Sequence, residues 1–272
     1  MTGVQTCALP ISGTALKVPT GIPSLDKLFW GGNPGYTRGS TVLASGTAGT
    51  GKTSLAAAFA IETCKRGERC IFYSYEESAG QLIQNMGSIG IHLKPWVKKG
   101  LLKIVAIRPS FSGLELHLLD LYKLVDSFKP QSVVIDPLTS LIGEGDEREI
   151  RSMITRMIDL LKSRGITTFF TSLVSSSAEN DTSGEIGVSS LIDTWIVVRE
   201  LEEDGGRIRT RGLFIVKSRG TGHSSDVHKL VLSDKGIDIE PMHAEAGHNQ
   251  HAKKKKRSLQ PPQSGIKSEE KL

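Results

Sequence analysis

The sequence has few cysteines and no long apolar run. No uninterrupted apolar segment of its 272 residues approaches the roughly 18 residues that a membrane-spanning helix needs, so we expect no transmembrane helix and no membrane partner. The three cysteines, Cys7, Cys64 and Cys70, match neither the spacing of a zinc site nor that of a redox motif. Such cysteine usage favours a reducing compartment, and we therefore expect a cytoplasmic protein.

Most of the chain also lacks net charge. The formal net charge of +5 arises in residues 247–272, which hold seven of the 34 Lys and Arg and two of the 29 Asp and Glu. Residues 1–246 therefore carry 27 charges of each sign, and an argument from bulk charge to nucleic acid applies only to the tail. The tail contains a basic run, which consists of Lys253, Lys254, Lys255, Lys256 and Arg257. We expect this run to be solvated or to dock a partner; a weak nucleic-acid contact and a localisation-like signal are the alternatives.

The two ends of the chain differ in composition from its middle. Residues 243–272 have almost no large apolar side chains to offset the entropy of ordering, so we expect a disordered basic tail. Residues 1–14 lack the apolar core of a signal peptide and the charges of a targeting presequence, and we expect them to be disordered or artefactual. One domain, residues 15–242, remains, and its length suffices for a sizeable core.

Strand-like and helix-like segments alternate within this domain. The pattern predicts strands at residues 40–45, 70–75, 102–107, 132–135 and 167–171, with helices at 54–65, 77–86, 113–128 and 147–164. Alternation of this kind favours an α/β fold with a mainly parallel central sheet and helices on both faces. Two hairpins follow, 194–200 with 209–217 and 229–232 with 237–239, which predict antiparallel strands at the C-terminal edge of the sheet.

A glycine-rich segment between the first predicted strand and the first predicted helix matches the P-loop pattern. Its glycines would let backbone N–H groups converge on phosphate oxygens, and the helix would direct its positive end at the same anion. Lys52 would reach the β- and γ-phosphates, and the Thr53 hydroxyl would ligate Mg²⁺. A chance glycine-rich turn is the alternative. The sequence thus predicts an ATP and Mg²⁺ site formed by Gly46, Thr47, Ala48, Gly49, Thr50, Gly51, Lys52 and Thr53.

Acidic residues follow two of the predicted strands. Asp136 ends an apolar strand, as expected of an acid that holds Mg²⁺ through water; a turn Asp before Pro137 is the alternative. Glu76 and Glu77 come directly after the strand at 70–75, where the ligand crevice of such a sheet lies. Adjacent carboxylates would repel a polyphosphate, so they are not there for binding alone. We expect Glu76 to be the general base, with Glu77 beside it or favouring the next helix's N-terminus.

These segments, with two others, resemble a single ATPase domain of the KaiC family, which has a RecA-like P-loop NTPase fold. The further segments are residues 20–28, TGIPSLDKL, followed by the pairs 31–32 and 34–35, and residues 217–223, KSRGTGH. The resemblance runs from about Thr20 to Pro241. It implies a ring, usually of six subunits, with ATP between neighbours and a catalytic base among the paired glutamates.

The resemblance also implies roles for residues late in the chain. Lys217 and Arg219 would stabilise charge on the γ-phosphate of the adjacent subunit, with His223 near the same nucleotide; a solvated strand face and a surface histidine are the alternatives. The pair Ser189 and Ser190 stands where part of the family autophosphorylates, although a serine pair there is also plain structure in related ATPases. Circadian members carry two such domains and this chain has room for one, so we expect no transfer of clock function.

The function expected from these features is an ATP-hydrolysing ring that acts as a signalling or regulatory switch with a protein partner, autophosphorylation being a further option. The alternative from another class is a recombinase-like ATPase on single-stranded DNA, which needs basic and aromatic residues in its channel loops. Residues 173–188 hold three acids and no basic or aromatic residue, and acids also dominate around Gly143. We therefore expect no nucleic-acid partner.

Overall fold

The computed structural model describes residues 16–31, 34–108, 114–144, 147–174, 189–203 and 208–242. The chain divides after Pro241 into two units, and every helix and strand below belongs to the first. The predictions for residues 1–14 and 243–272, including the basic run, lie outside the described residues.

A nine-stranded sheet organises the domain, in the order β11-β10-β9-β8-β3-β7-β6-β4-β5. Neighbours from β8 to β5 are parallel, and β9, β10 and β11 add antiparallel strands at one edge. This confirms the predicted mixed α/β sheet, and each predicted strand is present. The strands are β3 (Thr41–Gly46), β4 (Cys70–Ser74), β5 (Leu102–Ala106), β6 (Ser132–Asp136), β7 (Thr167–Leu173), β8 (Thr194–Glu203), β9 (Ile208–Ser218), β10 (His228–Ser233) and β11 (Gly236–Pro241).

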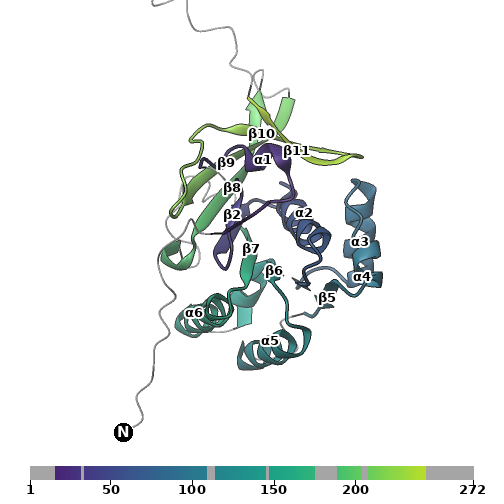
Figure 1. Ribbon diagram of the computed structural model, residues 1–272. Helices are drawn as coiled ribbons and strands as arrows, with labels where there is room; N and C mark the ends of the chain where they lie inside the picture. The colour runs from purple at the N-terminus through teal and green to yellow at the C-terminus, as the bar shows by residue number, and fades with distance from the viewer. Residues whose placement is uncertain are drawn as a thin grey trace, which may run out of the picture. The chain divides into compact units, whose positions relative to one another are not determined.

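Helices cover both faces of the sheet, because neighbouring side chains of its strands point to opposite sides. Phe169 of β7 joins the apolar cluster under α2 (Lys52–Lys65) and α3 (Ala79–Ser88), whereas Phe170 joins the cluster under α5 (Leu114–Phe128) and α6 (Glu147–Ser163). Figure 1 shows α5 and α6 on one side of the central strands and α2 on the other. Six apolar residues at helical spacing in α6 are all buried: Ile150, Met153, Ile154, Met157, Ile158 and Leu161.

The start of α3 differs from the prediction. The helix begins at Ala79 because Ser78 forms a capping box with Gln81: the Ser78 side chain accepts from the Gln81 N–H at 3.3 Å, and the Gln81 side chain accepts from the Ser78 N–H at 3.1 Å. Glu77 therefore lies before the helix. The helix also ends later than predicted, at Ser88 rather than at residue 86.

Several short elements were not predicted. Two antiparallel strands, β1 (Lys17–Val18) and β2 (Tyr36–Thr37), form a small separate sheet. The helices α1 (Pro23–Asp26) and α4 (Lys94–Lys98) and the 3-10 helices η2 (Leu138–Glu144) and η4 (Ser189–Leu191) are too short to give a periodic pattern.

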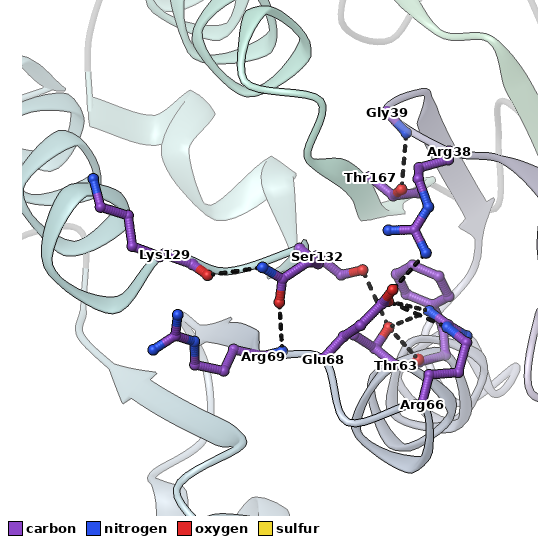
Figure 2. A network of polar contacts seen from close by, with 11 residues as sticks. Arg38, Gly39, Thr63, Arg66, Glu68, Arg69, Lys129, Ser132 and Thr167 are labelled. Carbon is purple, nitrogen blue, oxygen red and sulfur yellow. Dashed lines mark hydrogen bonds and ion pairs between the residues drawn. The ribbon is translucent and has the colours of Figure 1, made fainter. Parts of the chain in front are cut away.

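A polar network ties together the loops at the amino ends of the parallel strands (Figure 2). Thr63, fully buried near the end of α2, contacts the Ser132 hydroxyl of β6 at 3.1 Å and accepts from Arg66 Nη2 at 3.3 Å. Glu68 binds Arg66 at 3.0 Å and Arg38 at 2.5 Å. These bonds fix one end of the sheet and leave the loops at the carboxyl ends available for a ligand.

Replacing Thr63 by Val should lower the free energy of unfolding by about 1–3 kcal/mol, because Arg66 and Ser132 each lose a buried partner. Thr155, half-buried in α6, provides the matched control: its hydroxyl donates to the carbonyl four residues earlier at 2.7 Å, as that of Thr63 does at 3.1 Å. Thr155→Val should change stability by less than about 0.5 kcal/mol. Urea unfolding measures both, and equal losses would contradict the role given to the network.

Candidate functional site

The predicted phosphate loop leads from β3 in the middle of the sheet into α2. At Gly46 an added Cβ would lie 2.1 Å from the carbonyl oxygen of Val198 in β8, so only glycine permits this approach of the two strands. At Gly51, the N-cap of α2, φ is +101°, a backbone conformation that favours glycine. The loop thus presents its N–H groups at the positive end of a 14-residue helix.

The side chain of Lys52 folds back over this loop. Its Nζ donates to the carbonyl oxygen of Thr47 at 2.6 Å and lies 3.5 Å from the Thr50 hydroxyl, which itself donates to Thr47 O at 2.9 Å. Burial lowers the pKa of Lys52 to about 8, against the opposing effect of Asp136 and Glu76. Within the described part of the chain, the hydrogen bonds of this buried ammonium go to neutral oxygens, which it can exchange for those of an anion.

Asp136 lies at the carboxyl end of β6, buried beside the first turn of α2. Its carboxylate accepts hydrogen bonds from the hydroxyls of Thr171, in β7, and Thr53. Burial raises the pKa of Asp136, and the two hydroxyl bonds oppose that rise. Thr53 and Asp136 together offer hard oxygen donors, which is the chemistry that Mg²⁺ prefers. Among the described residues no group of three or more His, Cys, Asp or Glu is placed so that it could hold a metal ion.

The adjacent glutamates have different surroundings. Glu76 is exposed, lies 3.4 Å from the hydroxyl of Ser140 in η2, and acts electrostatically on both Lys52 and Asp136. Glu77 is half-buried and turns toward α3, where Asn85 Nδ2 donates to its Oε1 at 3.1 Å. The other Glu77 oxygen is buried and has no hydrogen-bond partner among the described residues. Only Glu76 therefore shares its electrostatic environment with the loop lysine and the strand-end acid.

The remaining predicted site residues lie at the opposite end of the sheet. The register pairs Thr194 with Val42 on one side and with Ser218 on the other, so the end of β9 lies level with the start of β3, with β8 between them. Gly46 is four residues further along β3, a distance of roughly 13 Å at about 3.3 Å per residue. The structure thus separates Lys217 and Arg219 from the phosphate loop of their own chain. His223 lies further along the segment after β9, where it forms an isolated antiparallel bridge with Phe29.

Other groups around the loop were not predicted from the sequence. Arg211 of β9 donates to the carbonyl oxygen of Gly49 at 3.3 Å, and the indole N–H of Trp195 donates to the Ser45 hydroxyl at 2.8 Å. Thr171 reaches Asp136 only because β7 lies beside β6. No local motif marks these residues; strand order brings them together.

Two predictions concern segments that fall largely outside the described residues. Residues 175–188, most of the acidic loop at 173–188, lie outside the described residues, as do residues 145–146 near Gly143.

No helix in the described parts of the chain combines the length and apolarity that crossing a membrane requires.

The sheet, its helices and the strand-loop-helix junction define a RecA-like P-loop fold. The profile of a family described as "ATPase: KaiC" matches residues 18–244. The chain belongs to this KaiC family of ATPases.

Curated relatives extend beyond the part that resembles this chain. The chain is 45% identical over 224 residues to "Circadian clock protein KaiC2" of Synechocystis sp., covering 82% of this chain and 39% of that protein. It is 35% identical over 224 residues to "Circadian clock oscillator protein KaiC" of Parathermosynechococcus lividus, covering 82% of this chain and 40% of that protein. The chain thus spans about two fifths of the length of these relatives.

Affinity for a nucleoside triphosphate should fall as the pH rises above about 8, the pKa of Lys52 in the free protein. A bound triphosphate favours the ammonium and raises the pKa of Lys52. The affinity is therefore highest below the pKa of the free protein and decreases by up to about tenfold per pH unit above it. Calorimetric titrations from about pH 7 to pH 9.5 measure this slope. Lys52→Arg, which stays charged, should flatten it; a wild-type affinity that is constant over the range would contradict the assignment.

Proposed function

We propose that this chain binds ATP with Mg²⁺ and hydrolyses it, with Glu76 as the general base. The observation that carries the proposal is the convergence of a loop of backbone amides, the buried ammonium of Lys52 and the carboxylate of Asp136 at the carboxyl edge of one sheet. Membership of an ATPase family supports the same reaction.

Each group has a part in phosphoryl transfer. The loop amides and Lys52 bind the β- and γ-phosphates, which positions the reacting phosphorus and offsets charge that develops on its oxygens. Thr53 and Asp136 would hold Mg²⁺, which neutralises phosphate charge when bound. Glu76 orients the attacking water and accepts its proton, and Ser140 supports the carboxylate from η2. Glu77, turned toward Asn85, fixes the segment between β4 and α3.

Removing the carboxylate of Glu76 should separate binding from chemistry. We expect Glu76→Gln to bind ATP as wild type does and to lose at least about 100-fold in kcat, because a general base contributes about that much. Glu77→Gln is the matched control one residue away and should lose less. Lys52→Ala should bind no nucleotide. Phosphate release and equilibrium ATP binding test these variants, and equal binding by wild type and Lys52→Ala would overturn the site.

We extend the proposal to a ring of subunits, six being usual in the family, in which ATP lies between neighbours. Arg219 and Lys217 would meet the γ-phosphate bound by the adjacent chain, with His223 near the same nucleotide. Their separation from their own phosphate loop supports action in trans, because neither is needed there within one chain. Arg219 keeps 54% of its side-chain surface exposed, which makes it accessible to a second subunit.

Mixing two inactive variants tests the trans arrangement. Glu76→Gln has a defective nucleotide site but intact cations, whereas Arg219→Ala has an intact site but lacks one cation. Mixed rings contain interfaces with both functional halves, so the mixture should hydrolyse ATP well above the sum of the separate rates. The control mixes Glu76→Gln with Glu76→Gln,Arg219→Ala, which should remain inactive. Additive rates in the first mixture would contradict trans catalysis.

The output we propose is a switch, in which the nucleotide state of the ring controls a signalling partner, as the clock names of the relatives suggest. Autophosphorylation is a second candidate, because the carbonyl oxygen of Ser190 accepts from Arg219 and the pair Ser189 and Ser190 thus adjoins a proposed γ-phosphate cation. A hydroxyl competes with water only when held close to that phosphate. Intact mass after incubation with ATP distinguishes a phosphorylated chain from one that only releases ADP.

A further inference from the structure

Asp193 joins several elements at the amino end of the parallel strands. It directly precedes β8, and its Oδ2 accepts from the backbone N–H of Thr41 at 2.9 Å and from Lys162 Nζ at 2.7 Å. Its Oδ1 lies 3.5 Å from Arg219 Nη1. The backbone contributes as well, since the Arg219 N–H donates to the Asp193 carbonyl oxygen at 2.9 Å. One carboxylate thus connects β3, α6 and the segment after β9.

Several cations lie near Asp193. Lys162 and Arg219 both pair with it, and the Asp193 carboxylate opposes the repulsion that Lys162 and Arg219 exert on Lys217. Lys162, Asp193 and Arg219 also line a common pocket with Arg38. The Asp193 carboxylate therefore helps to hold these cations close to one another.

The guanidinium of Arg219 is held at two points. Asp193 lies at Nη1, and the carbonyl oxygen of Ser190 accepts from Nη2. A long arginine side chain otherwise samples many rotamers, and two anchors on one planar fork restrict both its direction and the plane of its donors. The side chain is nevertheless exposed, so this restriction serves a group that reaches outward.

We propose that Asp193 is a positioning residue that orients Arg219 for the nucleotide of the neighbouring subunit. The inference rests on the trans arrangement proposed above. It places Asp193 on the subunit that supplies the cations, where Asp193 orients Arg219 without touching the nucleotide. The expected defect therefore lies in one subunit only. Loss of the Asp193 charge impairs hydrolysis in the nucleotide site of the adjacent subunit, whereas the phosphate loop of the same chain still binds ATP and supports hydrolysis.

Asp193→Asn tests this direction, because the amide oxygen still accepts from the Thr41 N–H while the charge is removed. Alone, the variant should bind ATP as wild type does and lose about tenfold to a hundredfold in kcat, the cost of a misplaced catalytic group. Asp126→Asn is the control: Asp126 pairs with Arg164 and Lys129 on the exposed surface of α5 and should be dispensable.

Two mixtures give the decisive readout. Mixed with Glu76→Gln, Asp193→Asn supplies the nucleotide site and receives intact cations, so activity should recover. Mixed with Arg219→Ala, it must supply the cations, and activity should stay low. Recovery in the second mixture would overturn the proposal. Absence of recovery in the first would also overturn it, because it would assign the defect to the chain's own site or fold.

A second variant guards against a folding defect in Asp193→Asn. Arg219→Lys keeps the charge but loses the planar fork that bridges Asp193 and Ser190, and should show the same pattern, rescued by Glu76→Gln but unable to rescue Arg219→Ala. If Arg219→Lys restored full ATP hydrolysis in a mixture with Arg219→Ala, an oriented guanidinium would not be needed. Failure of the Glu76→Gln and Arg219→Ala mixture identifies a different error, in the trans arrangement itself.

Discussion

The position of β3 in the middle of the sheet, between β7 and β8, determines where both parts of the proposed site lie. Its carboxyl end must pass so close to Val198 that residue 46 has no room for a side chain, and the chain then turns through the glycine-rich loop into α2. Its amino end is bound to Asp193 through the backbone of Thr41. One buried six-residue strand thus carries the phosphate loop at one end and, at the other, bonds to Asp193, which pairs with the proposed trans cation Arg219.

The electrostatics of the site follow from this packing. The Lys52 ammonium and the Asp136 carboxylate are both taken out of water, and the two pKa values move toward the neutral forms because burial disfavours either charge. Neutral oxygens of Thr47, Thr53 and Thr171 offset part of that cost. A magnesium-bound triphosphate would offer both groups stronger partners. Its binding would therefore offset the part of the desolvation cost that the neutral oxygens leave uncompensated.

Much of this could be predicted from the sequence because the signals are local. The apolar runs of β3, β4 and β6, the glycine pattern at 46–51 and the acid that ends β6 each lie within a few residues, and the order of elements predicts a parallel sheet. The predicted start of α3 was wrong, although the sequence contains a local signal for the observed start, the capping box of Ser78 and Gln81. The different surroundings of Glu76 and Glu77 follow from it, since that cap turns Glu77 toward Asn85.

Other parts of the site could not be predicted because they depend on strand order. Thr171 bonds to Asp136 and Arg211 to the loop from strands that are distant in sequence. In the sequence Asp193 is an ordinary acid before a strand, and only the fold places Thr41, Lys162 and Arg219 around it.

The most direct measurement is a structure of the assembled protein with Mg²⁺ and a non-hydrolysable ATP analogue. We predict that Lys52 Nζ leaves Thr47 O for the phosphates and that Arg219 of an adjacent subunit faces the same nucleotide. A loop lysine still bound to Thr47, with the analogue held elsewhere, would contradict it.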